Sequence, residues 1–402
     1  MKNHPLESAK RFFARPFFSN PRTLFGLWLL LPIIAALLKI HKHNNFLVFR
    51  GVFWHTWQQT SLYAKYPAEY YDSNYYGPVF SLLIAPFALL PVWVGLLFWL
   101  VALSMALYWA TRGLPLTHRM RVFIYWFCAH ELLTALFMSQ FNIAIAAIVI
   151  ATFFCIEKEK DVWATLLIVV GTFVKLYGIV GLAFFFFSRH KLKFIASFIG
   201  WSAVCFAAPM LISSPEYVIS QYGEWYKSLT VKNGLNLFSQ AQNVSLLGMV
   251  RKISGCASYS DLWLIVPGLA LFALPYLRIK QYGNLAFRYA LLASVLLFVV
   301  LFSTGSESST YIIAFMGVAI WYVTAPWKRG KWDIALMVFA FILTSMSPSD
   351  LFPAYLRRTY VHPYALKALP CVIIWLKLCY EMLTKDYYSE TFNNPKNLLS
   401  HE

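Results

Sequence analysis

The sequence predicts an all-helical, polytopic integral membrane protein. Hydrophobic residues make up 59% of the chain and charged residues only 13%, whereas soluble domains carry about a quarter charged residues. Long apolar runs recur along the whole chain, and the basic residues sit in short segments between them. The net charge of +17 is therefore an orientation signal, and nucleic acid is not an expected partner.

Apolar runs that can cross a bilayer need about 20 helical residues. We expect membrane spans near residues 23–40, 92–111, 121–138, 140–156, 192–212, 261–277, 285–303, 308–325, 331–346 and 366–383.

Segment 162–187 is apolar but is interrupted by Lys175 and by the Gly171 and Gly178 pair, so it forms either one long span or two half-spans. Basic loops should lie on the cytoplasmic side, with the N-terminus. The basic segment 188–193 meets this rule only if 162–187 enters and leaves the membrane on the same face. The pattern therefore favours a broken helical hairpin, within about eleven spanning or half-spanning segments.

With basic loops inside and successive spans crossing in alternate directions, a large first loop, 41–91, should lie outside the membrane. Loops 213–260, 304–308 and 347–365 should lie on the same side. Within the first loop, 77–91 is too short to span and contains prolines, so we expect it at the outer interface. Residues 1–385 form one membrane domain, and a polar cytoplasmic tail, 386–402, follows it.

Acidic residues in these outer loops are the candidates for catalysis. Glu69 and Asp72 are three residues apart and would share one face of a helical turn, where a carboxylate can act as a general base toward a hydroxyl group. The alternative is a solvated loop with acids that serve solubility. Glu307 lies in a short polar break between two spans, either as a cavity carboxylate or as a residue favoured by a helix N-terminus.

Ionisable residues inside the spans are candidates for function, because they are costly in the membrane. Lys175 is one, and its alternative is a side chain that reaches back to the membrane surface. His130 and Glu131 present the same choice, the alternative for either being a structural contact between helices.

Polar residues near the outer ends of spans are candidates for substrate binding. Gln140 and Asn142 suit sugar hydroxyls but also suit helix caps. Arg251 suits a phosphate, because a guanidinium binds phosphate oxygens through two hydrogen bonds, or it is a solvated surface residue.

A series of segments carries a resemblance to a known family. They are SLYAKYPAEYYDSNYYGPVFSLLIAPFALLP, SQFNIA, FVKLYGI, QNVSLLGMVRK and SESSTYIIAF, which run in this order between about Asn44 and Phe315. In sequence and predicted topology the chain resembles the polyprenol-phosphate-dependent glycosyltransferases of the GT-C fold. Within them it is similar to glycosyltransferase family 87, the bacterial mannosyltransferase-like group.

The resemblance implies an inverting transfer of a hexose, with mannose as a candidate, from a polyprenyl-phosphate carrier to a glycan or glycolipid acceptor. The reaction would take place on the extracytoplasmic side of the bacterial inner membrane. The family's base is an acid early in the first outer loop, where this chain has Asn44 and Asn45. The resemblance therefore leaves Asp72, Glu69 or Glu307 as the base.

Matching positions imply further binding residues. Lys175 and Arg251 are expected near the lipid phosphate, while Gln140, Asn142 and Asn243 are expected to line the cavity. Asn44 and Asn45, at the position of the family's base, are further substrate-binding candidates. A lipid phosphate is a good leaving group, so we expect neither a metal ion nor a cofactor.

Two other functions remain open. A lipid or solute transporter would predict paired repeats and charges at mid-membrane, and no repeat is visible. A non-catalytic protein that binds lipid-linked sugars is compatible with the amides at Asn44 and Asn45.

Overall fold

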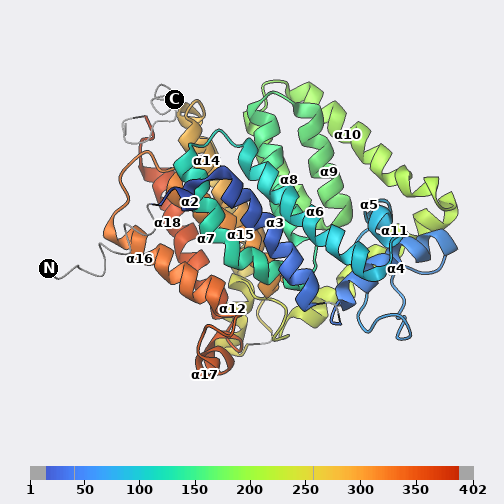
Figure 1. Cartoon of the computed structure of the whole chain (residues 1–402). Helices are drawn as coiled ribbons and strands as arrows, with labels where there is room; N and C mark the ends of the chain where they lie inside the picture. Colours follow the sequence, from blue (N-terminus) through green and yellow to red (C-terminus); the bar gives the residue numbers. More distant parts are fainter. Residues whose placement is uncertain (1–14, 40, 257, 389–402) are drawn as a thin grey trace.

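Helices form the regular structure of the chain in the computed structural model, which describes residues 15–39, 41–256 and 258–388 (Figure 1). No strand occurs within these residues, so the predicted all-helical membrane class is confirmed. The predicted tail lies outside the described residues from position 389 onward, and its boundary at 385 stays a prediction.

The predicted spans correspond to helices. Those long and apolar enough to cross a membrane are α3 (Pro21–Leu38), α6 (Val92–Gly113), α7 (His118–Phe137) and α10 (Lys191–Ala207) with its 3₁₀ extension η2 (Ala208–Leu211). Shorter apolar helices are α8 (Asn142–Glu157), α9 (Asp161–Val174), η1 (Leu176–Phe187), α13 (Leu262–Ala273) with η3 (Leu274–Leu277), α14 (Leu285–Leu301), and η5 (Ser308–Thr310) with α15 (Tyr311–Val323). The last segments are α16 (Lys331–Phe339), continued by the π-helix η6 (Ala340–Met346), and α18 (Leu369–Thr384), preceded by η8 (Leu366–Ala368).

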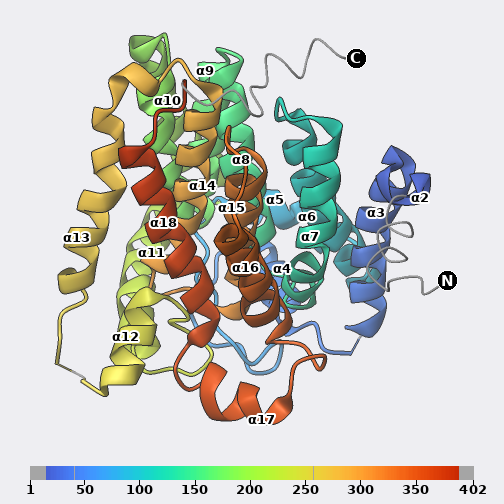
Figure 2. The same cartoon turned by 90° about the vertical axis from the view of Figure 1, so that its left-hand side faces the viewer.

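The centre of the bundle is formed by α14 and α15, whose side chains are buried along almost their whole length. Small elements lie at the ends of the bundle: α2 (Pro16–Ser19), η4 (Ile279–Gln281), α17 (Ala354–Leu356) and the π-turn η7 (Arg357–Val361). Figure 2 shows α13 at one side of the bundle, with α12 (Leu246–Ser254) and α17 at one end.

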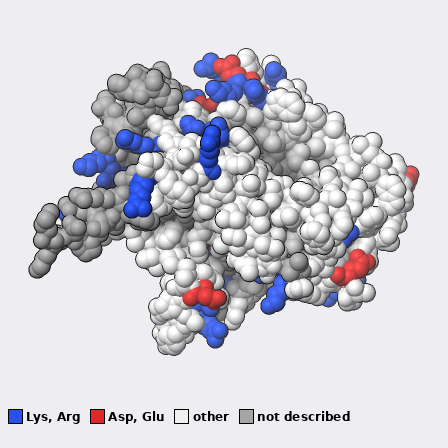
Figure 3. Space-filling model, viewed as in Figure 1, with Lys and Arg blue, Asp and Glu red and all other residues white. Residues whose placement is uncertain are grey.

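Charged side chains gather toward the two ends of the bundle on the face drawn in Figure 3, and a broad region between them is nearly free of charge. At one end, Glu157 pairs with Arg288 and Glu159 with Arg189. At the other end, Arg357 pairs with Asp350. A charge-free band between polar ends is what a bilayer requires of the surface it covers.

Segment 162–187 forms the predicted broken hairpin. α9 and η1 run antiparallel, and the Ser188 hydroxyl donates to Asp161 Oδ1 at 2.6 Å, so both ends of the segment lie together. The two helices pack closely because Gly171 faces Gly178; a Cβ on Gly178 would lie 2.2 Å from the Gly171 carbonyl carbon. The chain reverses at Lys175, which has extended backbone angles.

Part of the large first loop is helical. It contains α4 (Asn44–Gln58), which buries Phe46, Phe49 and Phe53, and α5 (Phe80–Ala88), a short helix within the segment that we expect at the interface. The segment between them, 59–79, returns across α4 and carries the predicted acids. The amide of Gly77 donates to the Val174 carbonyl at 3.1 Å, which ties this loop to the end of α9.

The loop between α10 and α13 also contains helices. α11 (Pro215–Asn236) begins at Ser214, whose hydroxyl accepts from the Tyr217 amide, and α12 (Leu246–Ser254) begins at Ser245 in the same way. Both serine caps satisfy backbone amides that the first turn leaves free. α11 reaches the first loop through the Trp225 indole, which donates to the Tyr75 carbonyl at 2.9 Å.

Candidate active site

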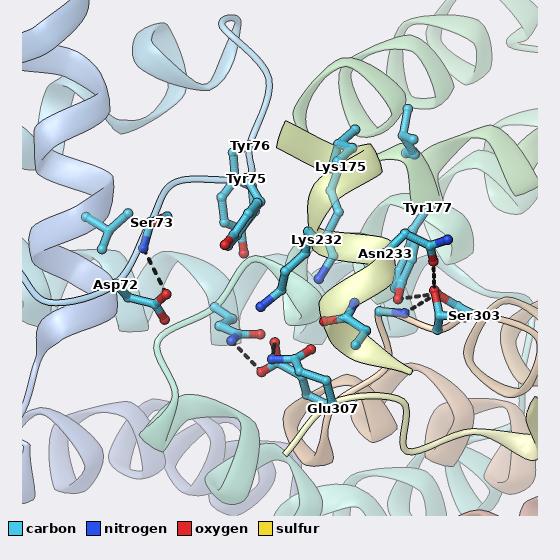
Figure 4. Close-up of a pocket in the computed structure, with 18 of the residues that line it drawn as sticks. Asp72, Ser73, Tyr75, Tyr76, Lys175, Tyr177, Lys232, Asn233, Ser303 and Glu307 are labelled. Carbon is cyan, nitrogen blue, oxygen red and sulfur yellow. Dashed lines mark hydrogen bonds between the residues drawn. The ribbon is translucent and has the colours of Figure 1, made fainter. Parts of the chain in front are cut away.

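A cavity of about 360 Å³ lies where the first loop, α11, the turn of the hairpin and the segment before η5 meet. Figure 4 shows its charged side chains. Asp72 comes from the first loop, Lys175 from the hairpin turn, Lys232 from α11 and Glu307 from the residues before η5. Carboxylates and ammonium groups from four separate elements therefore line one space.

Amide side chains hold Glu307 in place. Gln140 Nε2 donates to Glu307 Oε2 at 2.7 Å, and Gln242 Nε2 donates to Glu307 Oε1 at 2.7 Å. The Glu307 backbone amide donates to the Thr310 hydroxyl at 3.0 Å, so the residue also caps the start of the following helix. Each carboxylate oxygen is fixed, which gives Glu307 a defined orientation.

A third amide, Asn142, connects this carboxylate to Lys175 through Gln140. The buried Asn142 donates through Nδ2 to Gln140 Oε1 at 2.8 Å and to the Ser309 hydroxyl at 3.1 Å. Its Oδ1 accepts from Lys175 Nζ at 2.6 Å. Gln140 and Lys175 line the cavity, whereas Asn142 lies behind them and sets their positions.

The broken hairpin is the reason that Lys175 reaches the cavity. Because α9 stops at Val174 and η1 starts at Leu176, the side chain of the intervening residue projects from the turn. The ammonium lies 4.8 Å from the Tyr177 ring centroid, a cation–π distance.

Lys232 is a cavity residue that the sequence interpretation missed. Its Nζ lies 4.7 Å from the Tyr75 ring centroid. The signal that could have revealed it is helical spacing, because Trp225, Leu229, Lys232 and Asn236 all line the cavity and recur on one face of α11.

Asp72 is the exposed carboxylate of the site. Its Oδ1 accepts from the Ser73 amide at 2.8 Å, and no other hydrogen bond to this side chain occurs within the described residues. Burial raises the pKa of the nearby Tyr75 phenol, and the Asp72 charge raises it further. Tyr75 therefore stays protonated at neutral pH and can donate a hydrogen bond to a ligand.

The paired asparagines at the start of α4 have separate contacts. Asn44 Oδ1 accepts from the Tyr71 amide at 3.0 Å. Asn45 Nδ2 donates to the Met138 carbonyl at 2.8 Å, and Asn45 lines the cavity. Asn44 thus contacts the loop that carries Asp72, and Asn45 joins α4 to the end of α7.

Three of the predicted site residues have partners away from the cavity. Glu69 Oε2 lies 3.2 Å from His55 Nε2. Asn243 is buried, donates to the Leu237 carbonyl at 3.1 Å and accepts from the Ser245 hydroxyl at 2.8 Å. Arg251 is buried and pairs with Asp261 at 2.9 Å.

Gln242 and Lys252 are further polar residues of this region. Gln242 lines the cavity and contacts Glu307 directly. Burial lowers the pKa of Lys252 to about 8, and its Nζ donates to the Gln242 carbonyl at 3.1 Å. Lys252 thus supports the backbone that presents Gln242. No group of three or more His, Cys, Asp or Glu side chains that could hold a metal ion occurs among the described residues.

A second space, of about 590 Å³, adjoins the cavity. The two share Leu176, Tyr177, Asn233, Ser303 and Thr304 as lining residues. Most of the remaining lining is apolar and comes from η1, α13 and the end of α14: Ile179, Val180, Leu262, Ile265, Phe298, Val299 and Phe302. Leu247 of α12 and the polar residues Ser260 and Asp261 complete it. We call this space the apolar groove.

Comparison with known proteins identifies the family. Residues 74–304 match glycosyltransferase family 87, a range that covers more than half of the chain and includes Lys175, Lys232 and the whole of the hairpin. Asp72 and Glu307 lie just outside the two ends of the match. No match was found among curated proteins. The family is one of GT-C-type glycosyltransferases, and the apolar helices described above fit a membrane protein; the chain belongs to glycosyltransferase family 87.

Proposed function

We propose that this glycosyltransferase moves a hexose from a polyprenyl-phosphate carrier to a hydroxyl group of an extracytoplasmic glycan or lipid, with inversion at the anomeric carbon. The observation that carries the proposal is one cavity lined by an exposed carboxylate, Asp72, and by the ammonium groups of Lys175 and Lys232. Mannose is the first sugar to test.

Asp72 is the proposed base. Its carboxylate takes the proton of the acceptor hydroxyl as the acceptor oxygen forms a bond to the anomeric carbon. The bond from that carbon to the phosphate oxygen breaks, and the electron pair leaves with the lipid phosphate. Attack from the face opposite the phosphate inverts the anomeric centre.

The lysines are the proposed phosphate ligands. Negative charge increases on the phosphate as the sugar leaves, and fixed cations stabilise that charge most strongly where water is excluded. Lys175 is held by Asn142 Oδ1 at 2.6 Å, so its position is set before the donor binds. Lys232 lies on α11 and lines the same cavity.

Glu307 is proposed to bind hydroxyls of the transferred sugar. Because Gln140 and Gln242 each donate to one of its oxygens, the carboxylate is held rigidly, and each oxygen retains lone pairs for a further donor. This role is distinct from that of Asp72, whose carboxylate is exposed and has fewer contacts. Gln140 and Asn45 are proposed to contact substrate at the same cavity wall.

The apolar groove supports a lipid-linked donor over a soluble nucleotide sugar. Its lining continues from the cavity between η1, α13 and α14. α13 buries only Gly268 among its described residues and exposes Trp263, Val266 and Leu269, as expected for a helix against lipid. A polyprenyl chain in the groove would leave its phosphate at the cavity, near Lys175.

Positive charge at the end opposite the cavity supports the proposed membrane orientation. The basic loops there include Arg189, Lys191, Arg278, Lys328 and Arg329. We therefore propose a cytoplasmic N-terminus, an extracytoplasmic cavity and a location in the bacterial inner membrane. Residues 1–385 would form the catalytic domain and the tail after them would be cytoplasmic.

The direct test is sugar transfer by the purified protein in lipid nanodiscs. Radiolabelled mannosyl and glucosyl polyprenyl phosphates are supplied with a glycolipid extract as acceptor, and the product's anomeric configuration is read by NMR. Transfer with inversion supports the proposal. Donor binding without transfer by the wild-type protein would favour a non-catalytic binding protein, and transfer from nucleotide sugars alone would exclude the lipid donor.

A further inference from the structure

An ion pair lies buried inside the bundle beside the site. Lys367 Nζ is 2.8 Å from Glu131 Oε1, and the exposed fractions of the two side chains are 4% and 0%. Glu131 lies in the middle of α7, and Lys367 lies in η8, just before α18. The pair thus joins α7 to η8 inside the bundle.

The same ammonium group contacts the segment that carries Glu307. Lys367 Nζ donates to the Ser308 carbonyl at 2.9 Å and to the Ser308 hydroxyl at 3.1 Å. Ser308 follows Glu307 directly and begins η5. One lysine therefore connects α7, the start of α18 and the backbone next to a cavity carboxylate.

Attraction between the two charges is a weak source of net fold stability. Desolvation of two charges is costly, and well-packed apolar residues often replace a buried ion pair with no loss of stability. The contact to the Ser308 carbonyl is what an apolar replacement could not provide. A carbonyl needs a donor, and Glu131 secures the position of the ammonium that supplies it.

We propose that Lys367, held by Glu131, is a positioning residue for Glu307 that acts through Ser308. The inference rests on the proposed function, because it takes Glu307 to be the carboxylate that binds the transferred sugar. Lys367 does not line the cavity, so its effect on transfer must pass through the protein. A shift of about 1 Å at such a carboxylate is enough to reduce the rate by roughly a hundredfold.

A double-mutant cycle tests this link. The first arm is E131L/K367M, which removes the pair without leaving a buried charge. The second arm is E307Q, and the third combines both. We expect E131L/K367M to lower kcat by about tenfold to a hundredfold in the wild-type background and by less than about twofold in the E307Q background. If E307Q turns over too slowly for kcat to be measured, the cycle is run with donor affinity instead. The four proteins compared are then the wild type, E131L/K367M, E307Q and the triple variant.

A variant with the two charges exchanged tests whether Lys367 acts through its position against Ser308 or only by neutralising Glu131. E131K/K367E keeps one positive and one negative charge but places a carboxylate against the Ser308 carbonyl. We expect it to remain folded by thermal denaturation and to stay slow. The control is E157L/R288M, which removes a pair at the opposite end of the bundle and should leave kcat unchanged.

The outcomes distinguish the two proposals. Equal loss of kcat by E131L/K367M in both backgrounds, or wild-type activity in E131K/K367E, would overturn the positioning role. Full activity and unchanged donor affinity in E307Q would instead overturn the role of Glu307 in the proposed function.

Discussion

The side chain of Asn44 accepts a hydrogen bond from the backbone amide of Tyr71, at 3.0 Å. This bond holds the residue before Asp72 against the first turn of α4. The family resemblance places the catalytic acid at Asn44 or Asn45, and in this chain Asp72 lines the same cavity as Asn45. We therefore interpret Asp72 as the replacement for the expected acid, with Asn44 as its anchor.

Replacement of Asp72 by asparagine should abolish most of the transfer activity. A positioned general base contributes about a hundredfold to ten-thousandfold to the rate, so D72N should lower kcat by at least about a hundredfold. The side chain is exposed, so the thermal stability should not change. The measurement is transfer of labelled sugar in nanodiscs, with E69Q as the control, because Glu69 lies in the same loop but pairs with His55. Wild-type kcat in D72N would show that another group acts as the base.

Loss of the Asn44 anchor should weaken catalysis without abolishing it. A hydrogen bond of this kind is worth about 0.5–1.5 kcal/mol, so N44A should reduce kcat by about twofold to tenfold. In the D72N background the same substitution should have almost no further effect, because the group that it positions is already absent. An equal reduction in both backgrounds would mean that Asn44 acts independently of Asp72.

Lys232 should affect donor binding more than turnover. A charged hydrogen bond to phosphate contributes about 1.5–3 kcal/mol, so K232M should raise KM for the lipid-phosphate donor by about tenfold to a hundredfold. The matched control is K227M, on the same helix but outside the cavity. The two variants remove the same charge, so an equal rise in KM for both would indicate a general field effect rather than a phosphate contact.

The apolar groove should select for the length of the lipid. A tryptophan at Ile265 would fill the groove, and I265W should raise KM for a long-chain donor while leaving that for a short-chain analogue nearly unchanged. V266W is the control, because Val266 is the next residue of α13 but is 61% exposed and lies outside the groove. If I265W affects both donors equally, the lipid does not occupy this groove.

The positions of the spans and the hairpin could be predicted from sequence because each depends on local properties. Apolar length gave the spans, and the basic segment 188–193, together with the interruption at Lys175, predicted the return of the chain to the same face. These signals work because the bilayer imposes one strong constraint on every residue that it surrounds. The same reasoning indicated Lys175 and Glu307 as separate functional candidates, and in the structure both line one cavity.

Other parts of the site could not be predicted because they depend on contacts between distant segments. α11 is too polar to appear in a search for apolar runs, so Lys232 was missed. Arg251 is a plausible phosphate ligand by residue type, yet in the structure the turn after α12 brings Asp261 to it. Residue type indicates what a side chain can bind, but the competing partner is set by the fold.

The hairpin itself should depend on Gly178. A Cβ there would lie 2.2 Å from the Gly171 carbonyl carbon, and the clash is with backbone, which cannot rotate away. G178A should therefore force α9 and η1 apart at a cost of about 1–3 kcal/mol, the usual range for overpacking. The displacement would also move Lys175, so donor KM should rise together with the loss of thermal stability. G200A is the matched control, because a Cβ on Gly200 in α10 meets nothing within 4 Å. Since alanine favours helix over glycine, G200A should leave the melting temperature unchanged or slightly higher. A melting temperature for G178A equal to that of G200A would contradict the close packing of the two hairpin helices.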